Sequence, residues 1–531
     1  MFFFKWIIIL VSGLGAVLIT AVWWRRTRKA RVPVSSAHLR GRSLRQADQV
    51  EAILKAQTED GNLRFGRFQF PARVAHGHFA CVGATGSGKT MIQRLLMQSV
   101  LTKIGRGRGS RALIYDAKQD LISILAGMKL SCSIRLFHPL DTRGTAWDLA
   151  ADITSPASAL QRASLLIPRS DRDTNPFFTN AARHLLFGVL LQCLLRVPGQ
   201  WSFRQVLLML RDTQLLRLIL DLSEETRHLL QYCTHEGTFQ NLVSTLLTYI
   251  GPYEIVAAAW DRSTSRLGLR AWLEEESILI LGHDEANRVA IDTLNRMVFQ
   301  RLTELILGQG EVTAANPRQT WLFLDEVREM GKLEGLSRLL TKGRSKGVAA
   351  VLGFQDVAGL HDVYGREVAE ELLGQCNSTV ILRLNSPGTA KWASQLFGTR
   401  EVLERSRNLN RSRSSRNLGF DFSASSGEAI SSGITKRDVV LESEFLDLPE
   451  PSPGGGLSAY FLNPITGGFR DHLPGDWIRT HLVSPDRLVP DCIPRPESDQ
   501  YLRPWDDTDA VLFGLLEVPA KAMLGSRGGW K

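Results

Sequence analysis

The chain has 531 residues, which is too long for one ordinary domain and predicts two or three folded units. Hydrophobic residues make up 44% and charged residues 22%, so the composition is globular and excludes a wholly disordered chain. The net charge of +10 favours polyanionic partners, although a basic, solvated surface alone would give the same value. The six cysteines are scattered without a CxxC pair, so we expect reduced thiols, a cytosolic body and no structural zinc site.

The N-terminus begins with an apolar run over residues 2–24, long enough to cross a bilayer once as a helix. Trp23 and Trp24 end this run, and basic residues dominate from there to Arg45. Basic flanks stay on the cytoplasmic side, so residues 1–24 are expected to be a single-pass transmembrane anchor with the bulk of the chain cytoplasmic. A cleaved signal peptide is the alternative, but the basic cluster follows the apolar run and no clear cleavage site is present.

The rest of the chain divides by its hydrophobic pattern. Residues 25–72 are expected to be a basic juxtamembrane linker with a helix near residues 43–57. Residues 73–151 and 276–470 alternate short apolar strands with helices, which predicts a mostly parallel, doubly wound α/β sheet. Residues 152–275 show helical patterns and few strand signals, which predicts an inserted all-α domain.

Three late segments carry weaker patterns. The Ser-, Arg- and Asn-rich segment 406–432 is expected to be a mobile loop. Residues 438–441 and 457–462 are expected to pair as strands. The Pro-rich tail at residues 471–531 is expected to be weakly ordered after Asp476.

The first motif is a complete phosphate-binding loop between an apolar strand and a helix. It matches G-x-x-x-x-G-K-[ST] with Gly83, Ala84, Thr85, Gly86, Ser87, Gly88, Lys89 and Thr90. The glycines let the backbone approach phosphate groups, and the N–H groups of the loop and helix N-terminus face the anion. We expect Lys89 to neutralise the β- and γ-phosphates of ATP and Thr90 to ligate Mg²⁺. A Gly-rich turn without a ligand is the alternative.

The second motif is an apolar strand, residues 321–324, followed by Asp325 and Glu326. Ligands bind at the carboxyl ends of the strands in open parallel sheets, so both carboxylates are expected at the nucleotide. Asp325 would hold Mg²⁺, and Glu326 would be the general base for the attacking water. Alone, such a pattern also occurs at surface turns.

The third motif is the basic segment 343–347 leading into an apolar strand that ends near Gln355. Gln355 is expected to sense the γ-phosphate or to place the water, or else to be an ordinary polar residue at a strand end. Arg344 follows Asp325 by 19 residues and would reach a neighbouring subunit's nucleotide as an arginine finger. A phosphate contact to DNA or a surface ion pair is the alternative for Arg344.

These pieces, in this order, resemble the type IV secretion coupling proteins of bacterial conjugation, in the TraD/TrwB subgroup. Besides the anchor and the three motifs, the resemblance rests on residues 115–118, 137–141, 147–148 and 177–183, and it covers roughly residues 75–465. The family implies an inner-membrane, hexameric ATPase with a RecA-like P-loop NTPase domain and an inserted all-α domain. It also implies DNA binding with little sequence preference and transfer of a relaxase–DNA complex to a type IV secretion channel, driven by ATP hydrolysis.

By this resemblance, Lys89 and Asp325 take the nucleotide roles, Gln355 the sensor role and Arg344 the trans-acting role, and a second finger would have to be Arg73. One expected span, where many relatives have two, puts the usual periplasmic contacts in doubt. Two other functions stay open. A chromosomal translocase of the FtsK kind would have several spans and a winged-helix tail. A nucleotide-switched docking receptor would not need Glu326.

Overall fold

The computed structural model describes residues 37–57, 63–169, 176–314, 316–413 and 424–517. The chain divides into two units, one of Met1–Leu44 with Ser394–Leu441 and one of Arg45–Ala393 with Glu442–Lys531. The predicted membrane anchor at residues 1–24 lies outside the described residues, as do residues 25–36 of the predicted linker.

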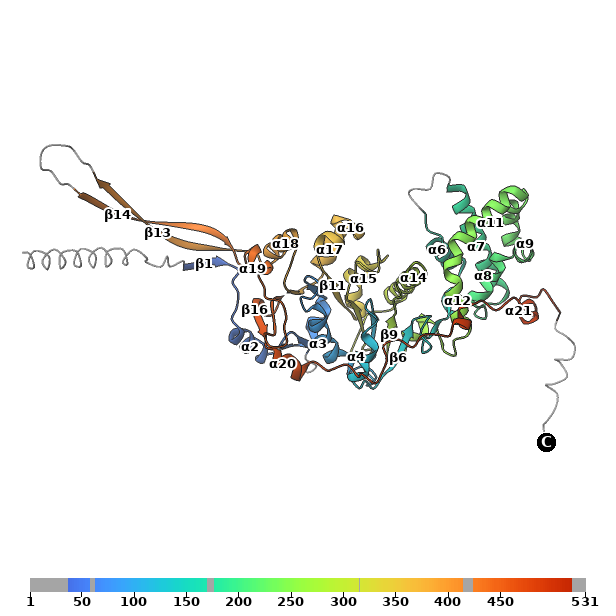
Figure 1. Cartoon of the computed structure of the whole chain (residues 1–531), viewed down its shortest axis with the longest axis horizontal. Helices are drawn as coiled ribbons and strands as arrows, with labels where there is room; N and C mark the ends of the chain where they lie inside the picture. The colour runs from blue at the N-terminus through green and yellow to red at the C-terminus, as the bar shows by residue number, and fades with distance from the viewer. Residues whose placement is uncertain (1–36, 58–62, 170–175, 315, 414–423, 518–531) are drawn as a thin grey trace, which may run out of the picture. The chain divides into compact units, whose positions relative to one another are not determined.

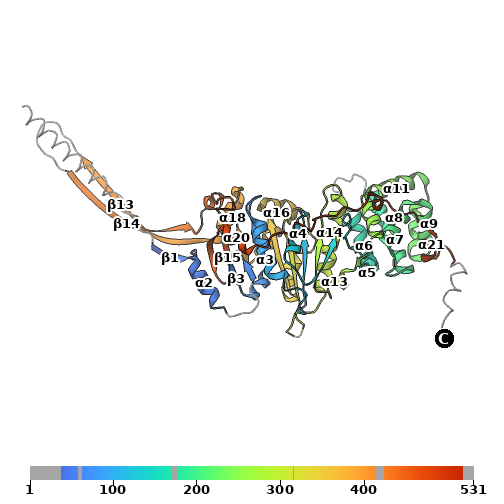
Figure 2. The same cartoon turned by 60° about the horizontal axis from the view of Figure 1, so that its bottom comes forward.

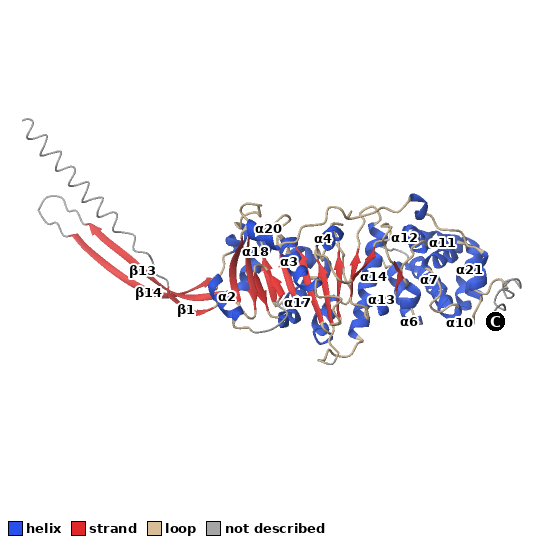
Figure 3. Cartoon of the chain, turned by 90° about the horizontal axis from the view of Figure 1, so that it is seen from below, coloured by secondary structure: helices blue, strands red, loops and turns tan. Residues whose placement is uncertain are grey.

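One nine-stranded sheet organises the larger unit (Figure 3). Its order is β16-β15-β12-β4-β11-β10-β5-β9-β6. All strands from β12 to β6 run parallel, and β15 and β16 add an antiparallel edge. The strands are β4 (Phe79–Val82), β5 (Ser110–Tyr115), β6 (Ser133–Phe137), β9 (Ser277–Leu281), β10 (Gln319–Leu324), β11 (Val348–Phe354), β12 (Ser378–Ile381), β15 (Leu457–Asn463) and β16 (Gly467–Leu473). The predicted mostly parallel sheet is confirmed.

Helices cover both faces of this sheet, so its central strands are apolar along their whole length. Every residue of β11 is buried, as expected of a parallel strand covered on both sides. On one face, α3 (Lys89–Leu101) and α4 (Leu121–Gly127) share a core with Phe79, Phe323 and Val351. On the other face lie α14 (Arg288–Leu307), α15 (Leu336–Lys342), α16 (Val357–Tyr364) and α17 (Arg366–Gly374) (Figure 1).

Helices fill the chain between two short parallel strands, β7 (Ala146–Trp147) and β8 (Arg266–Leu267) (Figure 2). They are α5 (Leu149–Asp152), α6 (Pro156–Leu166), α7 (Pro176–Arg196), α8 (Phe203–Arg211), α9 (Thr213–Asp221), α10 (Glu224–Arg227), η2 (His228–Cys233), α11 (Glu236–Ile250), η3 (Gly251–Tyr253) and α12 (Glu254–Asp261), with α13 (Leu269–Trp272) after β8. Among the described residues, Pro176–Arg196 and Glu236–Asp261 are apolar and long enough to cross a membrane, but half or more of each is buried inside this helical segment. Their apolar character therefore matches core helices.

The predicted linker is structured where the chain is described. Helix α2 (Ala47–Lys55) lies within the expected helical stretch. Strands β2 (Leu63–Phe65) and β3 (Phe68–Phe70) pair as a hairpin whose phenylalanines belong to the core of the sheet. The burial of Phe65 and Phe70 makes this segment part of the α/β domain, which corrects the expectation of a linker up to residue 72.

The expected mobile loop at residues 406–432 is largely a β-hairpin, which corrects that prediction. Strands β13 (Thr399–Arg413) and β14 (Ala424–Asp438) pair antiparallel over 15 residues each, and β1 (Ala37–Gly41) pairs with β13. Backbone hydrogen bonds make such a ladder, so a polar sequence does not prevent it. The expected pairing of 438–441 with 457–462 is also wrong, because β15 pairs with β12 and β16.

The described part of the Pro-rich tail, up to residue 517, is ordered, which corrects the expectation of weak order there. It contains α20 (Gly475–His481), η5 (Glu497–Gln500) and α21 (Asp507–Leu512), joined by extended segments. Hydrogen bonds with the body of the domain hold the extended parts. Asp141 accepts from the backbone N–H of Ile493, and Arg495 donates to the carbonyl of Pro139. We call residues 482–517 the strap, since they run from α20 to the helical segment.

Candidate nucleotide-binding site

The loop of residues 83–90 connects β4 to α3 at the carboxyl edge of the sheet. Gly86 and Gly88 adopt φ values of 76° and 96°, which favour glycine. A Cβ at Gly83 would lie 2.4 Å from Ser87 Oγ, and one at Gly88 would lie 2.7 Å from a methyl of Leu457. The N-cap residue of α3 is Gly88, which has no side chain that could cap the first turn. The loop therefore leaves backbone N–H groups at the helix N-terminus for an anion.

Lys89 is held at the mouth of this loop by a short polar contact. Its Nζ donates to the carbonyl of Gly83 over 2.7 Å and lies 3.7 Å from Glu326 Oε2. The residue is only 7% exposed, and burial lowers its pKa even though the carboxylates of Glu326 and Asp325 act in the opposite direction. Burial deprives the ammonium of the water that would stabilise its charge. The negative charge of a phosphate group in this position would compensate for that loss.

The two predicted carboxylates lie beside the loop at the end of β10. Thr90 Oγ1 donates to Asp325 Oδ2 over 3.3 Å. Asp325 Oδ1 is buried and has no hydrogen-bond partner among the described residues. A hydroxyl and a carboxylate are ligands that Mg²⁺ prefers, and the unpartnered oxygen calls for one more donor or cation. The side chains therefore fit a magnesium ion. Burial raises the pKa of Glu326, which suits a general base.

Gln355 connects the loop to the carboxylates. It follows β11, which lies between β4 and β10 in the sheet. Its Oε1 accepts from Thr85 Oγ1 over 3.0 Å, and its Nε2 donates to Glu326 Oε2 over 3.3 Å. The strand order therefore brings together the predicted phosphate loop, both carboxylates and the amide.

Arg344 is not part of this cluster. It lies in η4 (Gly343–Lys346), just before β11, whereas Gln355 follows the same strand. Seven strand residues separate the two edges by roughly 20 Å. Arg344 is exposed in a basic hollow of about 960 Å³ that is also lined by Arg338, Lys342 and Lys346. Arg73, the weaker candidate, precedes β4 at the same amino edge and donates to Gln57.

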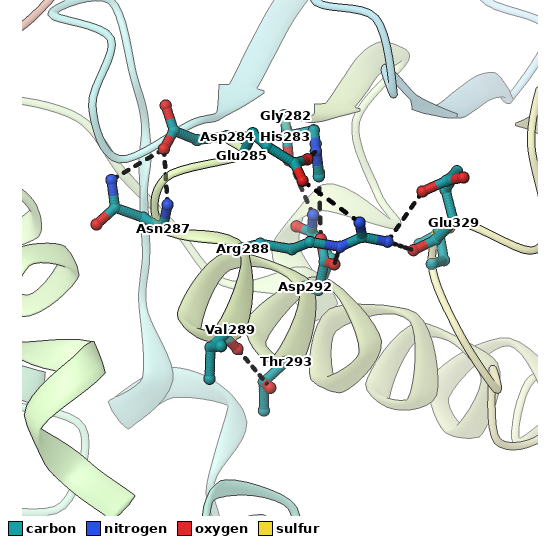
Figure 4. Close-up of polar contacts among 12 residues, drawn as sticks. Gly282, His283, Asp284, Glu285, Asn287, Arg288, Val289, Asp292, Thr293 and Glu329 are labelled. Carbon is teal, nitrogen blue, oxygen red and sulfur yellow. Dashed lines mark hydrogen bonds and ion pairs between the residues drawn. The ribbon is translucent and has the colours of Figure 1, made fainter. Parts of the chain in front are cut away.

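Two cationic residues, one beside the carboxylates and one beside the turn that follows them, had no role assigned from the sequence. Lys118 follows β5, and its Nζ donates to Thr90 Oγ1 over 2.8 Å. Lys118 belongs to the segment 115–118 that supports the family resemblance. This resemblance was the only feature of the sequence that pointed to Lys118. Arg288, at the start of α14, contacts Glu329 Oε2 over 2.9 Å and Asp292 Oδ2 over 3.1 Å (Figure 4). Arg288 thereby ties α14 to the turn that follows Glu326.

Comparison with known proteins finds relatives among coupling proteins. The coupling protein TraD of Escherichia coli (strain K12) is 23% identical over 363 residues, which cover 67% of this chain and 48% of TraD. The chain thus spans about half the length of the curated relative it matches.

Solved structures of the conjugative coupling protein TrwB share the fold. The unbound form of TrwBdeltaN70 has a TM-score of 0.64 at 20% identity, covering 88% of this chain and 98% of that one. TrwB in complex with ADP and Mg²⁺ has a TM-score of 0.62 at 20% identity, covering 88% and 99%. These likenesses confirm the RecA-like P-loop NTPase fold. The model for the type IV secretion-system coupling protein DNA-binding domain matches residues 62–457, and the chain therefore belongs to that family.

Proposed function

We propose that this protein is an ATPase that couples a relaxase–DNA complex to a type IV secretion channel and drives conjugative DNA transfer by ATP hydrolysis. One observation carries the ATPase part. Lys89 and Thr90 begin one helix, Asp325, Glu326 and Gln355 follow two neighbouring strands, and the polar atoms of the five residues converge within hydrogen-bond or ion-pair distance. Substrate ATP and a Mg²⁺ ion match this set of groups.

The residues divide the chemistry among them. The backbone of residues 83–90 and the ammonium of Lys89 bind the phosphates, with negative charge compensating the buried cation. Thr90 and Asp325 would hold Mg²⁺, which would supply further positive charge against the phosphates. Glu326 accepts a proton from the attacking water, for which its raised pKa is suited. Gln355 orients Glu326 and the water through its amide.

Arg344 is proposed to act on the nucleotide of a neighbouring subunit. It lies at the sheet edge opposite its own phosphate loop, so it cannot reach its own site without leaving η4. The hollow around it is concave and lined with cations, which suits phosphate groups presented by a second copy. In a ring built by head-to-tail contacts each subunit presents one surface to a different surface of the next, so the amino edge of one subunit would face the phosphate loop of its neighbour. We propose a homo-hexamer, the ring number implied by the resemblance.

The remaining partners rest on charge and family. The net charge of +10 favours DNA, bound through its phosphates without sequence preference. A single-pass anchor at residues 1–24 in the bacterial inner membrane would bring the ATPase to the secretion channel. The family description names a secretion system and DNA binding, and relaxase contact is our extension from them.

The test is ATP hydrolysis by the full chain in detergent, with and without single- or double-stranded DNA, over a range of salt. DNA should raise the rate, and the increase should fall as salt rises because the contacts are electrostatic. Lys89→Ala should lose the activity. An assembled protein whose hydrolysis ignores DNA would argue against a DNA motor.

A further inference from the structure

A lysine contacts both side chains proposed to hold Mg²⁺. Lys118 Nζ donates to Thr90 Oγ1 over 2.8 Å and lies 3.5 Å from Asp325 Oδ2. Thr90 Oγ1 in turn donates to the same carboxylate oxygen over 3.3 Å. The ammonium therefore lies against the oxygen atoms that a divalent cation would use.

The backbone around Lys118 is fixed by hydrogen bonds, while its side chain is half exposed. β5 is the neighbour of β10, so the turn after β5 lies beside Asp325. Within this turn Gln119 has a φ of 56°, and the carboxylate of Asp116 accepts from the backbone N–H groups of Asp120 and Leu121. The Lys118 side chain is 56% exposed. A fixed turn with a long, half-exposed side chain lets the ammonium leave for solvent without refolding.

Lys118 and a divalent cation cannot both have these contacts. An oxygen of Thr90 that ligates a metal no longer has that lone pair for an ammonium, and two cations at one carboxylate repel each other. Asp325 Oδ1 is buried without a hydrogen-bond partner among the described residues, so the lysine satisfies only one oxygen of this carboxylate. A hydrated divalent cation can satisfy both oxygens, and this difference favours the exchange.

We propose that Lys118 is an internal competitor for the Mg²⁺ site. Its ammonium holds Thr90 and Asp325 until Mg²⁺ and nucleotide displace it into solvent. Without divalent cation it remains near the phosphates as a second positive charge beside Lys89, so it supports metal-free nucleotide binding. This inference rests on the proposed function and adds a residue that sets its metal requirement.

The test measures nucleotide binding rather than turnover. The full chain in detergent is titrated with a fluorescent, non-hydrolysable ATP analogue, first in EDTA and then at fixed analogue with increasing Mg²⁺. Lys118→Met should bind the analogue more weakly in EDTA. It should also reach half-saturation at about two- to tenfold lower Mg²⁺, since a half-exposed ion pair is a weak competitor. Lys391→Met, an exposed lysine on α18 (Pro387–Phe397), is the matched control and should change neither value.

Lys118→Met should weaken analogue binding in EDTA but lower the Mg²⁺ concentration needed for half-saturation, and only competition with Mg²⁺ predicts both effects. A Lys118→Met protein that needs as much Mg²⁺ as the wild type, or more, overturns the inference. So does a parallel loss of both kinds of binding, which is what a purely structural lysine would give. Lys118→Gln and a thermal unfolding curve decide the case if the methionine variant folds poorly. Wild-type protein that bound no nucleotide would instead defeat the proposed function, independently of Lys118.

Discussion

The strap is attached to the helical segment by a buried ion pair, and breaking this pair should release its end. Arg204 Nη2 contacts Asp509 Oδ1 and Oδ2 over 2.6 and 2.7 Å, and both side chains are under 5% exposed. Removing one partner of a buried pair costs about 3–5 kcal/mol, because a buried charge is left without its partner. Asp261 stays 3.2 Å from Arg204 Nε, so we place the cost of Asp509→Ala near the lower limit, about 3 kcal/mol.

A cost of about 3 kcal/mol corresponds to roughly a hundredfold higher population of the opened strap. Limited proteolysis and hydrogen exchange of residues 500–517 measure this population. Asp507→Ala is the control, since Asp507 lies in the same short helix but is exposed. Equal cleavage rates in Asp509→Ala, Asp507→Ala and the wild type would refute the claim that the ion pair holds the strap.

Three further predictions concern the nucleotide site and the sheet beneath it. Glu326→Gln should keep nucleotide binding and lower hydrolysis by about 10²- to 10⁴-fold, measured by single-turnover assays, and unchanged hydrolysis would remove Glu326 as the base. Arg344→Ala should lower hydrolysis by about a thousandfold or more. Mixing it with Lys89→Ala protein should restore part of the rate, because some interfaces then combine an intact Lys89 with an intact Arg344, whereas no recovery would contradict action in trans. Burial lowers the pKa of His78 below its ordinary 6.5, and its ring bridges two backbone groups. Below pH 6.5 the unfolded chain gains a proton that folded His78 takes up only at lower pH. The free energy of unfolding therefore decreases as the pH is lowered. His78→Asn should reduce the slope of the free energy of unfolding against pH below pH 6.5. An unchanged slope would contradict the assignment of this pH dependence to His78.

That the side chains of the candidate site lie together could largely be predicted from sequence, because the signals are local. The phosphate loop is a contiguous pattern between a strand and a helix. Asp325 and Gln355 each follow a buried strand, and parallel strands end at one edge of the sheet. The contacts between these residues follow once β4, β11 and β10 are known to be neighbours in the sheet.

Other features depend on contacts that no local pattern encodes. The strap is held by pairs such as Asp141 with Ile493, which are 352 residues apart in the chain. The β13–β14 hairpin is polar, so its backbone ladder leaves little trace in the hydrophobic pattern. The role of Lys118 appears only once β5 is placed beside β10, because its ammonium then lies against Asp325.

The central claim is that ATP hydrolysis at this site powers DNA transfer. The most direct test deletes the gene in its own host and restores it as wild type, Lys89→Ala or Glu326→Gln, at matched protein levels. Conjugative DNA transfer is then counted. We predict that only the wild type restores transfer, because one variant loses phosphate binding and the other loses the base. Normal transfer with both variants would contradict the claim.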